Sequence, residues 1–399
     1  MKYQLITPEG TRDYVYEEVV LRNWYIDQLK ELYYSRGFSE VVTPTLEYLD
    51  VFMGKEELSS IDQYYKLVDS NGRLMAIRPD STMPIARVVA TRLKDEEEPL
   101  RLSYYQNILK VNKQMQGLSN EIFQSGVELI GKCSLQADLE ILCLAIETLK
   151  TLSKETFCFE IGYMGIFNRL INQLSISNQI KEQIRYLSEV KNYAALDQLL
   201  DSLPVQKEKE LLKILPRKFG DDVFEELLSK ELDQEMVADL MYLKGLIDYL
   251  KQLYPSISLT IDLGLVQQND YYTGIVFKGY FNNFSKELLS GGRYDSLLKQ
   301  FGKPQAAIGF AVNIDALIDI VKSQTVVEDS IERIIWIAKD YEVKGFQYFQ
   351  RLAKEQRVEL SLFETIEQTK EYAKKKNIQQ LDIVDNEISI KKYKNGEWV

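Results

Sequence analysis

Hydrophobic and polar positions follow two different periods along the first third of the chain, which predicts both helices and strands there. Residues 14–36 repeat apolar side chains at helical spacing, and Arg36-Gly37 is typical of a helix end. Two alternating runs then meet at Asn71-Gly72, a pair that favours a hairpin turn. The apolar positions that we expect on one side of the helix are Val19, Ile26, Leu29, Leu32 and Tyr33.

Further alternation predicts an antiparallel sheet. The runs LRLSYYQNILKV, residues 100–111, and EIFQSGVELIG, residues 121–131, are typical of two paired strands. Pro44 interrupts the strand-like run of residues 38–52, which confines that position to an edge or a boundary. The fold class is therefore expected to be α+β with antiparallel pairing.

The periodicity changes twice more along the chain. Residues 163–253 contain helical segments separated by polar breaks, which predicts a helical insertion in a larger domain that spans 1–322. The stretch 322–330 is polar and reads as a linker. Residues 331–399 alternate strand and helix patterns, which predicts a small C-terminal α/β module.

Composition indicates an ordinary globular protein. The chain has 399 residues, 45% of them hydrophobic, with no apolar run long enough to span a membrane and no secretory signal pattern at its start. We therefore expect a cytoplasmic location. The net charge of −11 disfavours a protein whose main task is to grip phosphate backbones. The cysteines Cys133, Cys143 and Cys158 form no C-x-x-C pair and are expected to be structural thiols.

The chain contains no histidine, which excludes catalysis by imidazole and any histidine-ligated metal. Residues 126–134, GVELIGKCS, nearly match a phosphate-binding loop, but Val127 to Ile130 have a strand pattern where such a loop needs exposed amides. No glycine pattern of a dinucleotide-binding fold follows a strand. We therefore expect neither a cofactor nor a metal.

Acidic, amide and phenolic side chains gather near predicted strand ends. Gln124 and Glu128 are four positions apart, so on one strand they face the same side. Such groups suit a small ligand with an ammonium group and a polar ring, although they are equally compatible with unrelated surface residues, and tyrosines at a strand start are often packing residues. The full set is Asp80, Thr82, Gln124, Glu128, Tyr271, Tyr272 and Tyr294.

Seven ordered segments resemble the signature blocks of class II histidyl-tRNA synthetases. They extend from residue 7 to about 320, and the C-terminal module resembles that family's anticodon-binding domain more loosely. The segments are TPEGTRD, GFSEVVTPTLEYLDVF, IRPDSTMPIAR, FQSGVELIG, NDYYTGIVF, GGRYDSLLKQFG and AIGFAVNIDAL. The resemblance implies a class II synthetase-like antiparallel sheet flanked by helices, and a homodimer formed around the block that contains Pro44.

The resemblance also implies a histidine-binding role for the polar set. In that family the residues that match Asp80, Thr82 and Gln124 hold the amino group of histidine. Those that match Glu128, Tyr272 and Tyr294 surround the imidazole, and Tyr271 is their neighbour in sequence. These seven residues are our predicted histidine-binding site.

Three positions depart from the synthetase pattern in the part of the site that would hold ATP. Where the synthetases have arginines for the α-phosphate, the charge that develops during adenylation and the γ-phosphate, this chain has Lys110, Gln267 and Ala316. Lysine keeps the charge of arginine but loses its bidentate geometry, and the other two lose both. We therefore expect no catalytic residues and no aminoacylation.

This pattern resembles the regulatory subunits of ATP phosphoribosyltransferase, which pair with a short catalytic subunit in the first step of histidine biosynthesis. The resemblance implies a hetero-oligomer, such as a hetero-octamer, with histidine as a feedback inhibitor, and no binding of tRNA or membrane. The absence of histidine would ease synthesis of the protein when histidine is scarce. The alternatives are a divergent histidyl-tRNA synthetase and a free-standing amino-acid sensor that binds RNA.

Overall fold

The computed structural model describes residues 3–53, 64–111, 119–204, 207–220, 222–266, 271–282, 287–321, 331–394 and 397–399. The chain forms two compact units, residues 1–325 and 326–399. Among the described residues, no helix is both long and apolar enough to cross a membrane. Gln267 lies outside the described residues.

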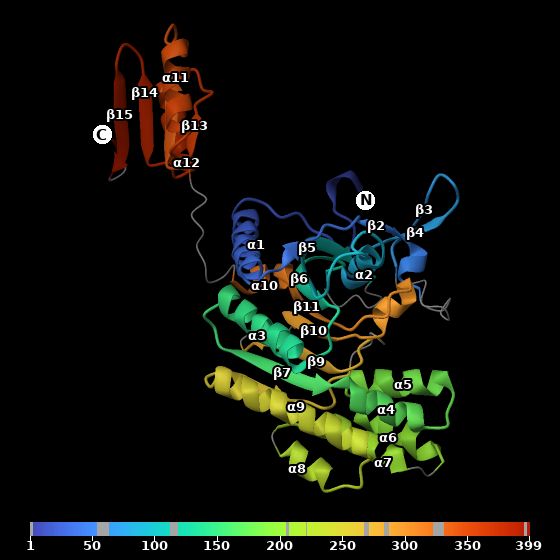
Figure 1. Cartoon of the computed structure of the whole chain (residues 1–399). Helices are drawn as coiled ribbons and strands as arrows, with labels where there is room; N and C mark the ends of the chain where they lie inside the picture. Colours follow the sequence, from blue (N-terminus) through green and yellow to red (C-terminus); the bar gives the residue numbers. More distant parts are fainter. Residues whose placement is uncertain are drawn as a thin grey trace. The chain divides into compact units, whose positions relative to one another are not determined.

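An eight-stranded sheet forms the centre of the first unit (Figure 1), in the order β1-β5-β6-β11-β10-β9-β7-β8. The six inner strands pair antiparallel, and only the edge strands β1 and β8 pair parallel with their neighbours. The α+β class with antiparallel pairing that the sequence predicts is thus confirmed. The strands are β1 (Ser39–Glu40), β5 (Leu100–Leu109), β6 (Glu121–Ile130), β7 (Phe157–Tyr163), β8 (Ser258–Ile261), β9 (Ile275–Phe281), β10 (Leu289–Arg293) and β11 (Ala307–Asn313).

Helices α1 (Glu17–Ser35), α3 (Leu135–Leu152) and α10 (Ile314–Val321) pack against one face of this sheet (Figure 1). Helix α1 ends where expected, with Arg36 as its C-cap and Gly37 at a positive φ of 82°. The predicted buried side of α1 is partly wrong, because only Leu29 and Tyr33 of the predicted residues are fully buried. The buried stripe is Leu21, Tyr25, Leu29 and Tyr33.

A second, three-stranded sheet has the order β2-β4-β3. It consists of β2 (Leu46–Tyr48), β3 (Lys66–Val68) and β4 (Leu74–Ile77). The turn at Asn71-Gly72 joins β3 to β4 as predicted, and Gly72 has the positive φ of 79° that this turn requires. Pro44 lies between β1 and β2, at the boundary predicted for it. Helix α2 (Thr82–Thr91) follows β4 directly.

Six α-helices lie among the described residues of Met164–Leu253, the stretch in which the sequence predicts a helical insertion (Figure 1). Leu170, Leu212 and Leu240, from three of these helices, are fully buried. Tyr163, at the end of β7, donates a hydrogen bond to Asp239 of the last helix, which ties the helices to the main sheet. The helices are α4 (Met164–Gln173), α5 (Asn178–Glu189), α6 (Tyr193–Ser202), α7 (Lys207–Ile214), α8 (Val223–Leu228) and α9 (Gln234–Leu253).

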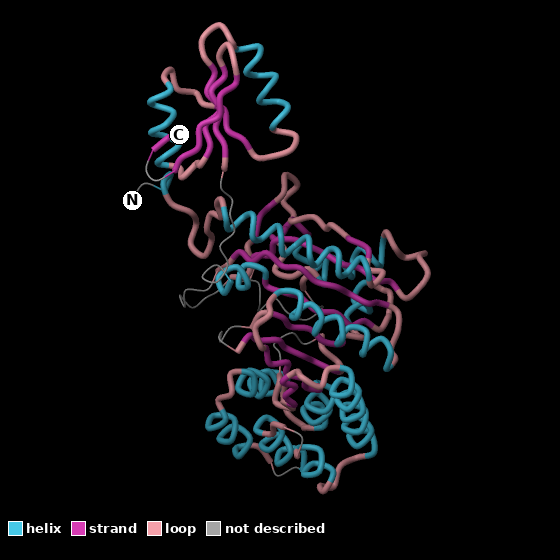
Figure 2. Tube along the Cα trace, turned by 90° about the vertical axis from the view of Figure 1, so that its left-hand side faces the viewer, coloured by secondary structure: helices cyan, strands magenta, loops and turns pink. Residues whose placement is uncertain are grey.

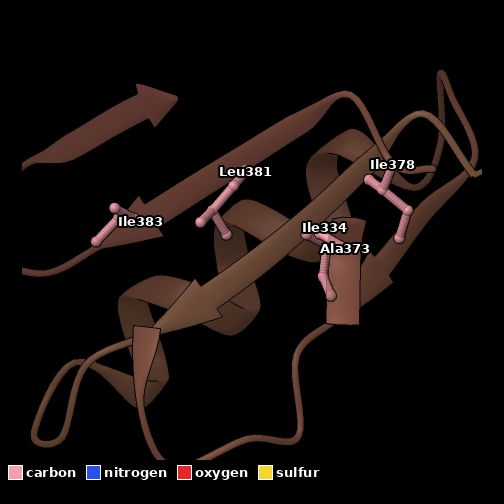
Figure 3. Close-up of a cluster of buried hydrophobic side chains, with 5 residues drawn as sticks. All are labelled: Ile334, Ala373, Ile378, Leu381 and Ile383. Carbon is pink, nitrogen blue, oxygen red and sulfur yellow. The ribbon is translucent and has the colours of Figure 1, made fainter. Parts of the chain in front are cut away.

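The second unit is a five-stranded mixed sheet with one helix on each face, as Figure 2 shows. On the α12 side, Ala373 packs with Ile334, Ile378, Leu381 and Ile383 (Figure 3). On the α11 side, Tyr348 and Leu352 pack with Ile335 and Val384. The elements are β12 (Arg333–Ile337), α11 (Glu342–Leu352), β13 (Val358–Leu360), α12 (Ile366–Lys375), β14 (Gln380–Val384), β15 (Ile388–Lys394) and β16 (Glu397–Trp398).

Candidate functional site

All seven residues of the predicted ligand site line one cavity in the first unit. Asp80 and Thr82 lie at the start of α2, and Gln124 and Glu128 project from β6. Tyr271 and Tyr272 precede β9, and Tyr294 follows β10. The structure therefore brings together residues that are more than 200 positions apart in the sequence.

The pleat of β6 explains why two of its polar side chains reach the cavity. Gln124 and Glu128 share the face that points away from the α1 and α3 layer, whereas Val127 is buried on the opposite face. Glu128 is 1% exposed. A carboxyl group so far from solvent requires hydrogen-bond partners within the protein.

Two hydroxyl groups supply these partners to Glu128. The Oγ1 of Thr82 donates to one carboxylate oxygen at 2.9 Å, and the hydroxyl of Tyr294 donates to the other. Burial nevertheless raises the pKa of Glu128 to about 8, because the two donors offset only part of the desolvation. At neutral pH the side chain is therefore mainly a carboxylic acid, with a proton available for a ligand.

Asp80 provides a second carboxyl group in the cavity. One of its oxygens accepts a hydrogen bond from the backbone N–H of Met83 at 2.9 Å, which fixes the side chain at the start of α2. Burial raises the pKa of Asp80, while the N–H of Met83 and the charge of Lys110 act in the opposite direction. A cationic group in the cavity would stabilise the ionised form of Asp80.

Three phenol rings form the aromatic wall of the cavity. The ring of Tyr271 lies 4.8 Å from that of Tyr272 and 5.7 Å from that of Tyr294, in the second case at 75°. Burial raises the pKa of all three hydroxyl groups, so they stay protonated as donors. Tyr271, which the sequence supported least, is thus in direct contact with the other two rings.

The cavity measures about 70 Å³. By this measure one water molecule needs about 10–15 Å³, so the space holds several heavy atoms. That size suits a small amino-acid ligand. Two carboxyl groups, one amide and three phenols can bind such a ligand through both its charge and its ring.

Tyr104 and Ser81 also line the cavity, and the sequence analysis missed both. Gly126 in the sequence could have indicated the position of Tyr104. It lies between Gln124 and Glu128 on β6 and pairs with Tyr104 of β5. A Cβ at position 126 would overlap the Tyr104 ring, so the glycine marks a close approach. The hydroxyl of Ser81 is buried and has no hydrogen-bond partner among the described residues.

The positions identified with lost adenylation residues lie in different places. Lys110 lines the cavity, and its positive charge acts to lower the pKa of Asp80. Ala316 lies in α10, 9% exposed, with its N–H bonded to the side chain of Asn313. Its methyl group has no charge with which to bind a phosphate. Among the described residues, no cluster of acidic or cysteine side chains is arranged to hold a metal ion.

Residues 10–317 match the family model described as histidyl-tRNA synthetase. The ATP phosphoribosyltransferase regulatory subunit of Clostridium novyi is 36% identical, over 98% of this chain and 95% of that protein. The regulatory subunit of Bacillus mycoides is 33% identical, over 100% of this chain and 96% of that protein.

Solved structures of the same fold superpose on this chain. An ATP phosphoribosyltransferase regulatory subunit/histidyl-tRNA synthetase from Bacillus halodurans superposes with a TM-score of 0.81 at 31% identity, covering 96% of this chain and 99% of that one. A histidyl-tRNA synthetase from Nostoc superposes with a TM-score of 0.76 at 19% identity, covering 99% and 96%. Because its identity to this chain is only 19%, the second structure supports the fold alone.

Proposed function

The chain belongs to the family of ATP phosphoribosyltransferase regulatory subunits, proteins with the fold of histidyl-tRNA synthetase, and from this premise we propose that it senses histidine for a separate catalytic subunit. Its role is regulatory and belongs to histidine biosynthesis. In this proposal the short catalytic subunit needs the chain for activity, and histidine bound to the chain inhibits the complex.

The observation that carries the proposal is the single cavity lined by all seven predicted residues. The α-ammonium group of histidine would lie between the oxygens of Asp80 and Gln124, near Thr82. The imidazole would meet Glu128 beneath the tyrosine wall. Because Glu128 holds a proton at neutral pH, it offers an O–H donor to one nitrogen of a neutral ring.

The same cavity supports binding without activation of the ligand. Adenylation must neutralise a triphosphate, and the chain has Lys110, Gln267 and Ala316 where the synthetase pattern has arginines. A single lysine supplies charge but no bidentate contact. We therefore assign no catalytic residue to the chain and expect no aminoacylation.

Inhibition requires that histidine binds more tightly to a less active arrangement of the complex than to the active one. The coupling free energy in such systems is about 1–3 kcal/mol, or roughly 5- to 150-fold in affinity. We propose a homodimer of this chain as the core of a hetero-oligomer with the catalytic subunit. The module of residues 331–399 would correspond to the anticodon-binding domain of the synthetases.

Co-purification with a short-form ATP phosphoribosyltransferase tests this function directly. The complex should form, the chain should raise the activity of the catalytic subunit, and histidine should lower it. Absence of a complex would contradict the proposal.

The match of residues 10–317 to the synthetase model favours a divergent histidyl-tRNA synthetase as the second candidate. Histidine-dependent exchange of pyrophosphate into ATP distinguishes the two functions. We expect no exchange, and exchange above background would establish the synthetase.

A further inference from the structure

Tyr104 lines the proposed histidine cavity and has no assigned role. It lies in β5 and is 1% exposed. We propose that its hydroxyl group binds the imidazole ring of histidine, at the ring nitrogen that Glu128 does not contact. The inference rests on the proposed function and adds to it a residue that determines ligand specificity.

The register of the main sheet places Tyr104 beside the two polar residues of β6. Tyr104 pairs with Gly126, which is two positions from Gln124 on one side and from Glu128 on the other. Alternate residues of a strand share one face and are about 7 Å apart. The three β6 positions therefore lie on the ligand side of the sheet, with Gly126 at the centre.

The end of the Tyr104 side chain lies over this central position. A Cβ added to Gly126 would overlap both the ring and the hydroxyl oxygen of Tyr104. Further along the same row of the sheet, Ala311 of β11 pairs with Gly126, and Ser290 of β10 pairs with Ala311. Both of these small residues line the cavity. The hydroxyl of Tyr104 thus lies next to space that a ligand can fill.

The hydroxyl of Tyr104 is not hydrogen-bonded to any residue that the structure describes. The two oxygens of Glu128 already accept from Thr82 and Tyr294. Burial, together with the charges of Glu128 and Asp80, raises the pKa of Tyr104, so its hydroxyl keeps the proton. A buried hydroxyl without a partner costs stability, and a ligand nitrogen at this position would offset that cost.

A neutral imidazole ring has two nitrogens with different requirements. One carries a proton and donates a hydrogen bond, whereas the other accepts one. In the proposed arrangement Glu128 serves one nitrogen and leaves the second without a partner. The hydroxyl of Tyr104 can donate or accept, so it can serve this second nitrogen in either tautomer. Two such contacts would favour imidazole over rings of similar size that lack nitrogen.

Replacing Tyr104 by Phe in the full chain removes the hydroxyl and keeps the ring. Calorimetric titration should show a histidine affinity about 3- to 10-fold lower, as expected for the loss of one hydrogen bond. The urea midpoint of the unliganded variant should be unchanged or higher, because the hydroxyl has no partner in the free protein.

Tyr105→Phe is the matched control. Tyr105 follows Tyr104 on β5, so its side chain faces the opposite side of the sheet, where its ring stacks on that of Tyr33 at 6.1 Å. This variant should bind histidine as the unmodified chain does.

Thienylalanine, an amino acid of similar size whose ring has no nitrogen, distinguishes a contact to the ring from a contact to the amino end. Its affinity, measured by displacement of histidine, should be nearly the same for the unmodified chain and for Tyr104→Phe. An equal fall in affinity for both ligands would overturn the assignment of the hydroxyl to the ring.

Unchanged histidine affinity in Tyr104→Phe would also overturn the inference. A lower affinity together with a lower urea midpoint would overturn it as well, because the hydroxyl would then have a structural role. These results leave the proposed function standing. If the unmodified chain binds no histidine, alone or in the complex, the proposed function itself fails.

Discussion

The hydroxyl group of Tyr294, which follows β10, donates a hydrogen bond to the carboxyl group of Glu128 in β6. Both side chains are almost fully buried, at 2% and 1% exposure. Because two strands separated by β11 hold the two groups, the position of the carboxyl is set by the sheet before any ligand arrives. This contact is the basis of the first prediction.

Replacing Tyr294 by Phe removes one donor to Glu128 and keeps the ring. Loss of one hydrogen bond to a buried polar group costs about 1–2 kcal/mol, so histidine affinity should fall roughly 5- to 30-fold. Calorimetric titration measures the change. Tyr249→Phe, at a 47% exposed tyrosine of α9, is the matched control and should bind normally. Equal affinities of the two variants would show that the hydroxyl of Tyr294 has no role.

Glu128 should make the free protein less stable as the pH rises. Its pKa is about 8 in the folded chain and near 4.5 when unfolded, so the folded state holds the proton more tightly. Its contribution to stability is therefore complete below pH 4.5 and is lost as the pH rises through 8, at up to about 1.4 kcal/mol per pH unit.

The Glu128→Gln variant lacks this titration. Urea unfolding at pH 5, 6, 7 and 8 should therefore show its stability rising relative to that of the unmodified chain. Parallel stability profiles for the two proteins would contradict the raised pKa.

Gly309→Ala should abolish the arrangement around Glu128. An added Cβ would overlap both the Glu128 carboxylate and the backbone carbonyl of Val127, and the backbone atom cannot move cheaply. We expect loss of histidine binding and a lower urea midpoint. Gly245→Ala is the control, because a Cβ there meets nothing within 4 Å and lies in helix α9. That variant should be equally or slightly more stable, and a similar loss in both would refute the steric explanation.

Arg293, the last residue of β10 and the neighbour of Tyr294, forms a buried ion pair. Its Nε donates to Asp138 of α3 at 2.9 Å, and Asp138 also accepts from Tyr242 of α9. Arg293→Gln leaves the carboxylate without its cation and should cost about 3–5 kcal/mol of unfolding free energy. Arg36→Gln removes a pair in which the arginine is 52% exposed, and should cost about 1 kcal/mol or less. Equal costs would contradict the importance of burial.

The sequence could predict the fold and the cavity residues because both leave local or ordered signals. The hairpin at Asn71-Gly72 follows from turn chemistry, and the strands β5 and β6 follow from alternation. Periodicity was less reliable for α1, where Leu21 and Tyr25 are fully buried but Val19, Ile26 and Leu32 only partly. The buried stripe therefore passes through Leu21 and Tyr25, and tertiary packing determines that position.

Tyr104 and Ser81 could not be predicted in the same way. Tyr104 enters the cavity through a cross-strand pair with Gly126, so its role depends on strand register. Such sites depend on tertiary proximity, which no local pattern encodes. The predicted histidine contacts themselves stay a prediction, and Gln267 lies outside the described residues.

The most direct test of the central claim is inhibition of the purified complex by histidine, measured with the unmodified chain and with Glu128→Ala. If the cavity senses histidine, the variant should need at least about ten times more histidine for half-inhibition, because a buried hydrogen bond to the imidazole is lost. Its rate without histidine should remain close to that of the unmodified complex. Identical inhibition curves for the two complexes would contradict the assignment of the cavity as the histidine sensor.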